Sequence, residues 1–463
     1  MSLLPQSALH DAITSTRSVR LVGRVTRVAG LLVDGTLPGA HLGMVCRLRV
    51  PGAAHNGIPA EVVALRERSV SLMPLGGVAG IQTGTEILTT GEQPSVRVGN
   101  GLLGRVLDGW GNPLDGKGKL TARAAPSRYP LDPAPLNPLL RAEVAEPLSL
   151  GVRAIDGMLT CGQGQRMAIL AGAGVGKSTL LAMMVKRSAA DVIVVGLVGE
   201  RGREVKRFVD HDLGPEGMQR AVLVAATSDH APALRVRAAR VATSIAEYFR
   251  DQGKRVLLLI DSLSRVAMAQ RELGLAVGEP PATKGYPPSA FAIIPRLLER
   301  AGPGLIPKTG VAGSITALYT TLLEGDDLGD PIGDAVKATT DGHIVLSRKL
   351  ADRGHFPAID ILGSTSRVMG ELVSDEHKAD AVAMRRLMAD HRAVHDLAVM
   401  GAYSHGSNAD YDRALAAWPD VEGWLTQGSS EAITLSRSAQ GLQALVAQHP
   451  GAKKPSRQTR SAS

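Results

Sequence analysis

The spacing of apolar residues divides the chain into stretches of different character. Between residues 18 and 96 the apolar runs are short, rich in valine and interrupted by glycine and proline, as in VRLVGRVTRVAG, LLVDGTL, GMVCRLRV and TEILTT. Short strands at regular spacing with turn residues between them are typical of small all-β domains. We therefore predict a small N-terminal β-barrel.

From about residue 150 the apolar runs become continuous, and helical stretches separate them. The runs are RMAILAG, DVIVVGLVG, AVLVAAT, RVLLLID, GSITALY and HIVLS. Continuous β-branched and leucine runs indicate strands buried on both faces, which is the pattern of a parallel sheet covered by helices. Of the helical stretches, the one after Ser228 is predicted to end at Gly253.

Between these two stretches lies a passage rich in glycine and proline, GWGNPLDGKGKLTARAAPSRYPLDPAPLNPLL, which we interpret as a long connection between domains. After about residue 375 the strand-like runs end, and DAVAMRRLMADHRAVHDLAVMGAY and DRALAAWPDVEGWLTQ have helical spacing. The predicted organisation is an N-terminal arm (1–18), a β-barrel (19–96), an α/β domain including the connection (97–375), a helical domain (376–448) and a basic tail (449–463).

Composition restricts the class of protein more than it identifies it. A chain of 463 residues is long enough for two or three domains with buried cores. Cys46 and Cys161 are too few for a disulfide framework or a cysteine zinc site, and they fit a reducing cytosol. No apolar run reaches the length of about 18 residues that spans a bilayer. The first residues lack the basic-then-apolar order of a signal peptide, so we expect them to be mature sequence.

The net charge of +8 raises the question of nucleic-acid binding. Half of that charge comes from the last residues, GAKKPSRQTRSAS, which contain four basic side chains and no acidic one. The rest of the chain is only modestly basic, so we expect no specific nucleic-acid partner. The tail is better interpreted as a disordered, solvated segment.

The stretch ILAGAGVGKSTLL carries the first chemical signal. It places a glycine-rich loop between an apolar strand and an apolar helical run, which is the context that a phosphate-binding loop requires. Glycines allow backbone N–H groups to turn toward phosphate oxygens, the lysine reaches the β- and γ-phosphates, and the hydroxyl suits Mg²⁺. Alanine stands at position 171, where the strict pattern has glycine. The predicted nucleotide-binding residues of this loop are Gly172, Ala173, Gly174, Val175, Gly176, Lys177, Ser178 and Thr179.

Two carboxylates follow other predicted strands. Asp261 ends the run RVLLLID, where it is placed to hold Mg²⁺ through water, although an aspartate there can also simply cap a helix. Glu200 follows the run DVIVVGLVG, and ligands of open α/β sheets lie at the carboxyl ends of strands. This glutamate can therefore orient an attacking water, or it can pair with Arg201 or Arg203.

Several longer segments carry a family resemblance: GLVGERGREV, LIDSLSR, GEPPATKGYPPSAF, GSITALYTTLLEGDD, DGHIVLSRKLADRGHFPAIDILGSTSRVM and GAYSHGSNADYDRAL. From about residue 20 to about residue 445 the chain resembles the flagellar and type III secretion export ATPases, relatives of the rotary ATP synthase α and β subunits. The resemblance implies an α/β fold: a RecA-like P-loop ATPase domain with a parallel sheet, preceded by a small N-terminal β-barrel and followed by a C-terminal helical domain.

The resemblance also implies roles for single residues. It makes Lys177 and Ser178 ligands of phosphate and Mg²⁺, Asp261 the second Mg²⁺ carboxylate, and Glu200 the residue that positions the attacking water. The remaining residues implied are Arg201 as a structural or phosphate-sensing neighbour, Arg265 near the γ-phosphate, Arg367 as an arginine finger for the adjacent subunit, Phe356 as the aromatic stacked on adenine, and Tyr403 on the other side of that pocket.

The function implied is that of a ring ATPase that hydrolyses Mg-ATP and assists protein export. ATP and Mg²⁺ are the expected cofactors, and a homo-oligomer, most plausibly a hexamer, is the expected assembly. Further expected partners are a regulator at the N-terminus, a central stalk protein, the export gate, chaperones and export substrates. The expected location is cytoplasmic, at the periphery of the membrane-embedded export apparatus.

Two alternatives stay open at this point. A catalytic subunit of a rotary ATP synthase has the same chemistry; Glu200 argues only against the non-catalytic type, which has glutamine there, while GEPPATKGYPPS and GAYSHG favour an export ATPase. An RNA-translocating RecA-like hexamer needs aromatic stacking platforms, and four phenylalanines in the whole chain make these scarce. Between flagellar and injectisome systems, GAYSHG favours the flagellar one.

Overall fold

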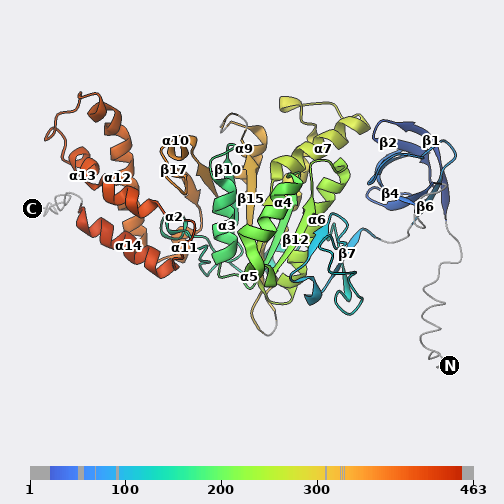
Figure 1. Cartoon of the computed structure of the whole chain (residues 1–463), viewed down its shortest axis with the longest axis horizontal. Coiled ribbons are helices and arrows are strands. Elements are labelled where there is room, and N and C mark those ends of the chain that lie inside the picture. Colours follow the sequence, from blue (N-terminus) through green and yellow to red (C-terminus); the bar gives the residue numbers. More distant parts are fainter. Residues whose placement is uncertain are drawn as a thin grey trace, which may run out of the picture.

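The computed structural model describes residues 21–50, 57–67, 69–89, 93–307, 310–323, 325, 327 and 329–450. The predicted N-terminal arm (1–18) and residues 451–463 of the predicted tail lie outside this range. Three bodies follow one another along the long axis, with a barrel at one end, an α/β body in the middle and a group of helices at the other end (Figure 1). Among the described residues, no helix combines the length and the apolar character needed to cross a membrane.

The first body is a closed six-stranded antiparallel barrel with the strand order β1-β2-β5-β4-β3-β6. In β2 and in the first half of β1 every second residue is buried, because successive side chains of a strand point to opposite faces. Val33, Leu48, Leu72 and Ile87 fill the interior, so the predicted barrel is confirmed. Its strands are β1 (Val22–Ala29), β2 (Leu32–Thr36), β3 (Val45–Arg49), β4 (Ile58–Arg66), β5 (Ser69–Pro74) and β6 (Glu86–Thr89).

The second body is built on a nine-stranded sheet in the order β17-β16-β10-β15-β13-β11-β12-β8, with β14 paired to β15. All neighbouring strands are parallel except the β16–β17 and β14–β15 pairs. The strands are β8 (Val106–Asp108), β10 (Arg166–Ala171), β11 (Val192–Val198), β12 (Ala221–Ala226), β13 (Arg255–Asp261), β14 (Gly302–Pro303), β15 (Ser314–Leu322), β16 (Gly342–Leu346) and β17 (Ile359–Ser366).

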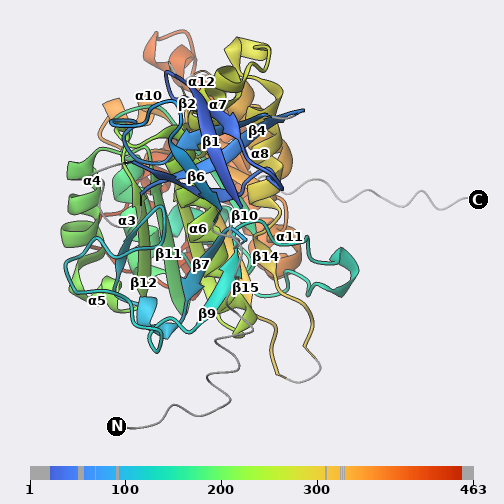
Figure 2. The same ribbon diagram turned by 90° about the vertical axis from the view of Figure 1, so that its right-hand side faces the viewer.

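Both faces of this sheet are buried, as the continuous apolar runs predicted. Leu170 and Leu258 belong to one hydrophobic core, and their chain neighbours Ile169 and Leu257 belong to a second core on the opposite face. Helices cover both faces (Figures 1 and 2). They are α2 (Arg153–Met158), α3 (Lys177–Arg187), α4 (Gly202–Arg207), α5 (Gly214–Gln219), α6 (Pro232–Asp251), α7 (Leu263–Val277), α8 (Pro288–Leu298), α9 (Pro331–Thr339), α10 (Arg348–Asp352) and α11 (Met369–Leu372).

Helix α6 confirms the helix predicted between Ser228 and Gly253, and it is the main cover of one face, packing on β11, β12 and β13. Short helical turns complete the body: the 3₁₀ turns η1 (Asn100–Leu102), η2 (Pro138–Leu140) and η4 (Thr283–Gly285), and the π-helical segment η3 (Phe208–Leu213).

The structure differs from the prediction in the glycine- and proline-rich passage. That passage is more than a connection, because β9 (Ser127–Pro130) pairs with β7 (Ser95–Val98) in a separate two-stranded sheet. Just before it, β8 adds a parallel strand to the edge of the main sheet. Asp115 holds this region together by accepting hydrogen bonds from Arg105 and from the backbone of Val106.

The third body contains α12 (Asp375–Val399), α13 (Ala409–Leu425) and α14 (Leu435–Gln448). These helices pack on one another and on α2. Trp424 at the end of α13 packs closely on α2: a Cβ added to Gly157 would lie 2.7 Å from its ring, so only glycine fits there without displacing the ring. The helical C-terminal body is therefore joined closely to the α/β body.

Candidate active site

The glycine-rich loop joins β10 to α3 as the sequence predicted. Gly174 has a φ of 77° and Gly176 a φ of 86°, in the left-handed region that favours glycine. Gly176 is also the residue immediately before Lys177, the first residue of α3. The loop therefore turns its backbone in front of the N-terminus of a helix, which is a favourable place for phosphate.

Strand register brings the two predicted carboxylates to this loop. β11 and β13 are parallel neighbours with Leu197 opposite Asp261, so Glu200, just beyond β11, lies at the same edge of the sheet. Lys177 Nζ forms a salt bridge with Asp261 Oδ1 and lies 3.8 Å from Glu200 Oε1. Each of the three side chains is less than a fifth exposed. The ammonium group thus lies between two carboxylates in a partly desolvated site.

This environment changes the protonation of Glu200. Burial, followed by the negative charge of Asp261, raises its pKa to about 7, although Lys177 acts in the opposite direction. The carboxyl of Glu204 in the first turn of α4 also raises this pKa. A carboxylate whose pKa is close to neutrality can accept a proton more readily than an ordinary surface glutamate, which suits a general base.

These residues line a cavity of about 600 Å³. It contains four basic side chains and four acidic ones, so its charges are balanced as it stands. The lining comprises Gly172, Ala173, Gly174, Gly176, Lys177, Ser178, Thr179, Leu181, Leu197, Glu200, Arg203, Glu204, Arg207, Phe208, Asp212, Asp261, Arg265 and Leu322. Of the predicted loop, Val175 alone does not line the cavity, because its side chain is buried in the core beneath the loop.

Arg265 is directed to the cavity by its packing. Its aliphatic stem lies against Gly199, where a Cβ would be only 2.9 Å from Arg265 Cβ. Its Nε is buried and has no hydrogen-bond partner among the described residues. A buried cationic donor without an acceptor is costly unless a ligand supplies one, and a phosphate oxygen fits. Arg201, by contrast, is exposed at the start of α4 and does not line the cavity.

The site offers oxygen ligands that suit Mg²⁺. Ser178 and Asp261 both line the cavity next to the loop, and hydroxyl and carboxylate oxygens are what this cation prefers. In the part of the chain that the structure describes, no group of three or more His, Cys, Asp or Glu residues is arranged to hold a metal. A cation here would therefore depend on nucleotide phosphates and water for its other ligands, as is common for Mg²⁺.

Phe356 lies beside the phosphate loop but outside the cavity lining. A Cβ on Gly176 would come within 3.2 Å of its ring, while 42% of the residue is exposed. An open aromatic face next to the loop can receive a base. Tyr403 is not brought to this place: its hydroxyl lies 2.9 Å from Asp412 Oδ1 and 3.0 Å from the carbonyl of Asn408, in the α12–α13 connection. This placement gives no support to Tyr403 as the second side of an adenine pocket.

Arg367 lies at the other end of the strands from Lys177. Its backbone N–H donates to Asp341, whose own N–H donates to Arg166 at the start of β10, whereas the phosphate loop follows the end of that strand. A six-residue strand is roughly 20 Å long. The exposed Arg367 side chain therefore cannot reach the cavity of its own chain.

Several residues of the site were not found by sequence reasoning. Thr320 on β15 donates a 2.6 Å hydrogen bond to Asp261 Oδ1 and is fully buried. Arg348 on α10 donates to the carbonyl of Ala173 in the phosphate loop. These contacts join residues far apart in the chain, so no local pattern announces them. The others are the cavity-lining residues Glu204, Arg207, Phe208 and Asp212.

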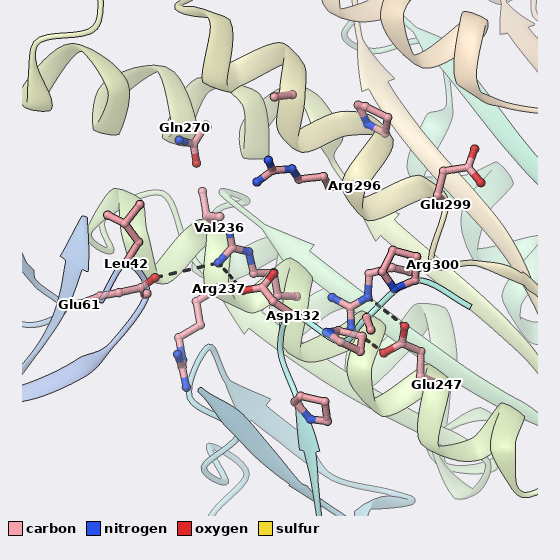
Figure 3. Close-up of a pocket in the computed structure, with 18 of the residues that line it drawn as sticks. Leu42, Glu61, Asp132, Val236, Arg237, Glu247, Gln270, Arg296, Glu299 and Arg300 are labelled. Carbon is pink, nitrogen blue, oxygen red and sulfur yellow. Dashed lines mark hydrogen bonds and ion pairs between the residues drawn. The ribbon is translucent and has the colours of Figure 1, made fainter. Parts of the chain in front are cut away.

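A larger cavity of about 1200 Å³ lies where the barrel meets α6, α7 and α8 (Figure 3). Several of its charged groups form pairs: Arg240 lies 4.0 Å from Glu61 of the barrel and 3.3 Å from Asp132, and Arg300 donates two hydrogen bonds to Glu247. Burial raises the pKa of Glu61. Of these pairs, the one between Arg240 and Glu61 connects the barrel to the α/β body, and the phosphate loop is not part of this cavity.

Comparison with known families matches all three bodies. Residues 25–91 match the beta-barrel domain and residues 151–366 the nucleotide-binding domain of the ATP synthase alpha/beta family. Residues 373–444 match the T3SS EscN ATPase C-terminal domain.

Individual relatives are similar over nearly the whole chain. A flagellum-specific ATP synthase of Bacillus subtilis is 46% identical over 439 residues, covering 95% of this chain and 98% of the relative. A type 3 secretion system ATPase of Sinorhizobium fredii is 48% identical over 416 residues, covering 90% of each. The solved structure of the assembled ATPase EscN from the enteropathogenic E. coli type III secretion system is 43% identical, with a TM-score of 0.85, and the match covers 92% of this chain and 100% of that one.

The barrel, nucleotide-binding and C-terminal domain models thus match in order along this chain, and the relatives are similar over nearly its whole length. The chain belongs to the flagellum-specific and type 3 secretion ATPases of the ATP synthase alpha/beta family.

Proposed function

We propose that this chain hydrolyses Mg-ATP as one subunit of a ring and that hydrolysis assists protein export through a flagellar or type III secretion apparatus. The observation that carries the proposal is the meeting of Lys177, Glu200 and Asp261 at one edge of the parallel sheet, in front of the phosphate loop. The family membership supports the export role, and it gives no support to an RNA-translocating ring or a rotary synthase subunit.

Each residue has a role that follows from its position. The loop N–H groups and Lys177 bind the phosphate chain, and Arg265 offers a terminal phosphate oxygen its Nε, which has no hydrogen-bond partner in the described part of the chain. Glu200 orients the attacking water and accepts its proton. Ser178 and Asp261 would hold Mg²⁺, which neutralises phosphate charge when it is bound with the nucleotide.

The base is proposed to stack on Phe356, which is partly exposed and whose ring lies beside Gly176. A phenylalanine offers the flat aromatic face that stacking on a base requires. Arg201 is proposed as a neighbour that supports the first turn of α4 and not as a direct phosphate ligand.

Because Arg367 cannot reach its own cavity, we propose that it acts on the site of an adjacent subunit. The relative EscN was solved as an assembled ATPase and, in a second structure, in complex with its central stalk EscO. By analogy we propose a homo-oligomer, of six subunits by resemblance, with a stalk partner of the same kind. A regulator at residues 1–18, contacts with the export gate, chaperones and export substrates, and a cytoplasmic location at the membrane-embedded apparatus complete the proposal.

A pair of substitutions tests the catalytic part. Lys177→Ala should abolish ATP binding, because the ammonium contacts phosphate in the ground state. Glu200→Gln should keep ATP affinity but lower kcat by at least about 10²-fold, since a positioned base acts in the transition state. Phosphate release and equilibrium binding of Mg-ATP by the full chain measure both. Near wild-type turnover of Glu200→Gln would contradict the assigned role.

A further inference from the structure

The segment of residues 424–431, which begins in the last turn of α13, contacts the α/β body at its nucleotide side. Gln427 is at the centre of this 424–431 segment and is only 3% exposed. Its Oε1 accepts a 2.7 Å hydrogen bond from the backbone N–H of Arg153, and its Nε2 donates to the carbonyls of Gly151 and Glu431 at 3.0 Å each. A buried amide with both donor hydrogens and its acceptor engaged has one orientation only.

The backbone of the same residue holds the candidate base-binding aromatic. The N–H of Gln427 donates a 3.0 Å hydrogen bond to the carbonyl of Phe356. The Phe356 ring lies on the last glycine of the phosphate loop, Gly176. The side-chain hydrogen bonds of Gln427 therefore hold its backbone N–H in place, and this N–H holds the backbone of Phe356 beside the loop.

Two arginines attach the same segment to the elements that carry the loop. Arg153, the first residue of α2, donates to the carbonyls of Trp424 and Thr426 at 3.0 and 3.3 Å and forms a salt bridge with Glu431. Arg187, the last residue of α3, donates a 2.5 Å hydrogen bond to the carbonyl of Ser429. Since α3 begins at Lys177, the 424–431 segment is joined to the helix of the phosphate loop as well as to Phe356.

We propose that Gln427 is a positioning residue for the nucleotide base: it transmits the position of the C-terminal helices to Phe356 and so sets affinity for the base independently of affinity for the phosphates. The inference rests on the proposed function, in which adenine stacks on Phe356. Movement of α13 relative to α2 then changes how well the aromatic face and the phosphate loop accept one nucleotide together. Through this contact a partner bound to the C-terminal helices acts on nucleotide retention without touching the cavity.

The test separates base from phosphates. Gln427→Met keeps the length of the side chain and removes its three hydrogen bonds. We expect its Kd for Mg-ATP, measured calorimetrically on the full chain, to rise about five- to tenfold, the lower part of the range for loss of a base–aromatic stack. Its Kd for Mg-tripolyphosphate, which has no base, should not change. The matched control is Gln443→Met, an exposed glutamine on α14, which should change neither constant.

A double-mutant cycle decides whether the effect passes through Phe356. Phe356→Ala alone should weaken ATP and spare tripolyphosphate, and adding Gln427→Met should cost little more, because two changes in one path are not additive. Additive losses, an unchanged ATP affinity in Gln427→Met, or an equal loss for tripolyphosphate would each overturn the proposal. If Gln427→Met does not fold, Gln427→Asn takes its place with the same criteria. An unchanged ATP affinity in Phe356→Ala would instead refute the adenine assignment, while Lys177→Ala still reports on the phosphate site.

Discussion

Hydrolysis should require two neighbouring subunits, and the position of Arg367 makes this testable. The residue lies beside the start of β10, while the phosphate loop follows the end of that strand, roughly 20 Å away. An isolated subunit therefore has the phosphate loop, Glu200 and Asp261, but lacks the arginine that neutralises charge on the transferring phosphoryl group. Arg367→Ala should bind ATP and assemble, yet hydrolyse more slowly by a factor of about 10³–10⁵.

Mixing two inactive variants should restore a fraction of the ATPase activity that can be calculated. In a ring with head-to-tail interfaces, a competent site needs Lys177 from one subunit and Arg367 from the next. When Arg367→Ala and Lys177→Ala subunits assemble at random in equal amounts, about one in four interfaces contains both intact residues. The mixture should recover about a quarter of wild-type activity, while each variant alone stays inactive.

The assay is steady-state phosphate release across a range of protein concentrations, with light scattering to follow assembly. Wild-type specific activity should rise steeply as subunits associate. The matched control is Arg386→Ala in place of Arg367→Ala, because Arg386 is an exposed arginine on α12. The reasoning fails if light scattering shows monomers that hydrolyse at the full rate, or if Arg367→Ala alone is as active as the wild type.

Three further predictions concern other parts of the molecule. Because the pKa of Glu200 is raised to about 7, its carboxyl is protonated below that pH, so kcat/KM for ATP should fall as pH drops through 7, whereas an unperturbed glutamate near 4.5 would keep it level to about pH 5. Thr320→Val removes the hydrogen bond to Asp261 and should raise the Mg²⁺ concentration for half-maximal activity about tenfold, with Thr320→Ser restoring it; an unchanged Mg²⁺ requirement would count against this role. Arg240→Met leaves Glu61 of the barrel without its ion pair and should lower the free energy of unfolding by about 2 kcal/mol, between the values for exposed and buried pairs, with ATP affinity unchanged; denaturant titration that shows no loss would refute it.

The fold could be predicted wherever burial imposes a repeating pattern. Strands such as β11 and β13 are buried on both faces and are written as unbroken apolar runs. β17 does not follow this rule, since its sequence IDILGSTS mixes polar and apolar residues and it lies antiparallel at the edge of the sheet. β8 has only three residues, and β9 lies in a passage dominated by turn formers, so their pairing depends on partners distant in the chain.

The site divides in the same way. The phosphate loop, Glu200 and Asp261 could be found because each lies at or just beyond the end of a buried strand, and strand ends meet at one edge of a parallel sheet. Thr320 and Gln427 could not be found, because a buried threonine in a strand and a glutamine after a helix have no distinctive neighbours. Their importance arises from hydrogen bonds across 59 and 276 residues of chain, which only the folded structure brings together.

The salt bridge between Lys177 and Asp261 couples the binding of phosphate to the binding of a divalent cation. Until ligands arrive, each of these groups is the counter-ion of the other. When phosphate binds the Lys177 ammonium, the Asp261 carboxylate loses its counter-ion. When a divalent cation binds that carboxylate, the ammonium becomes available for phosphate. Each ligand therefore raises the affinity of the site for the other, and by linkage both affinities rise by the same factor. Metal-free ATP alone and the cation alone should both bind weakly, so the site selects the two ligands bound together.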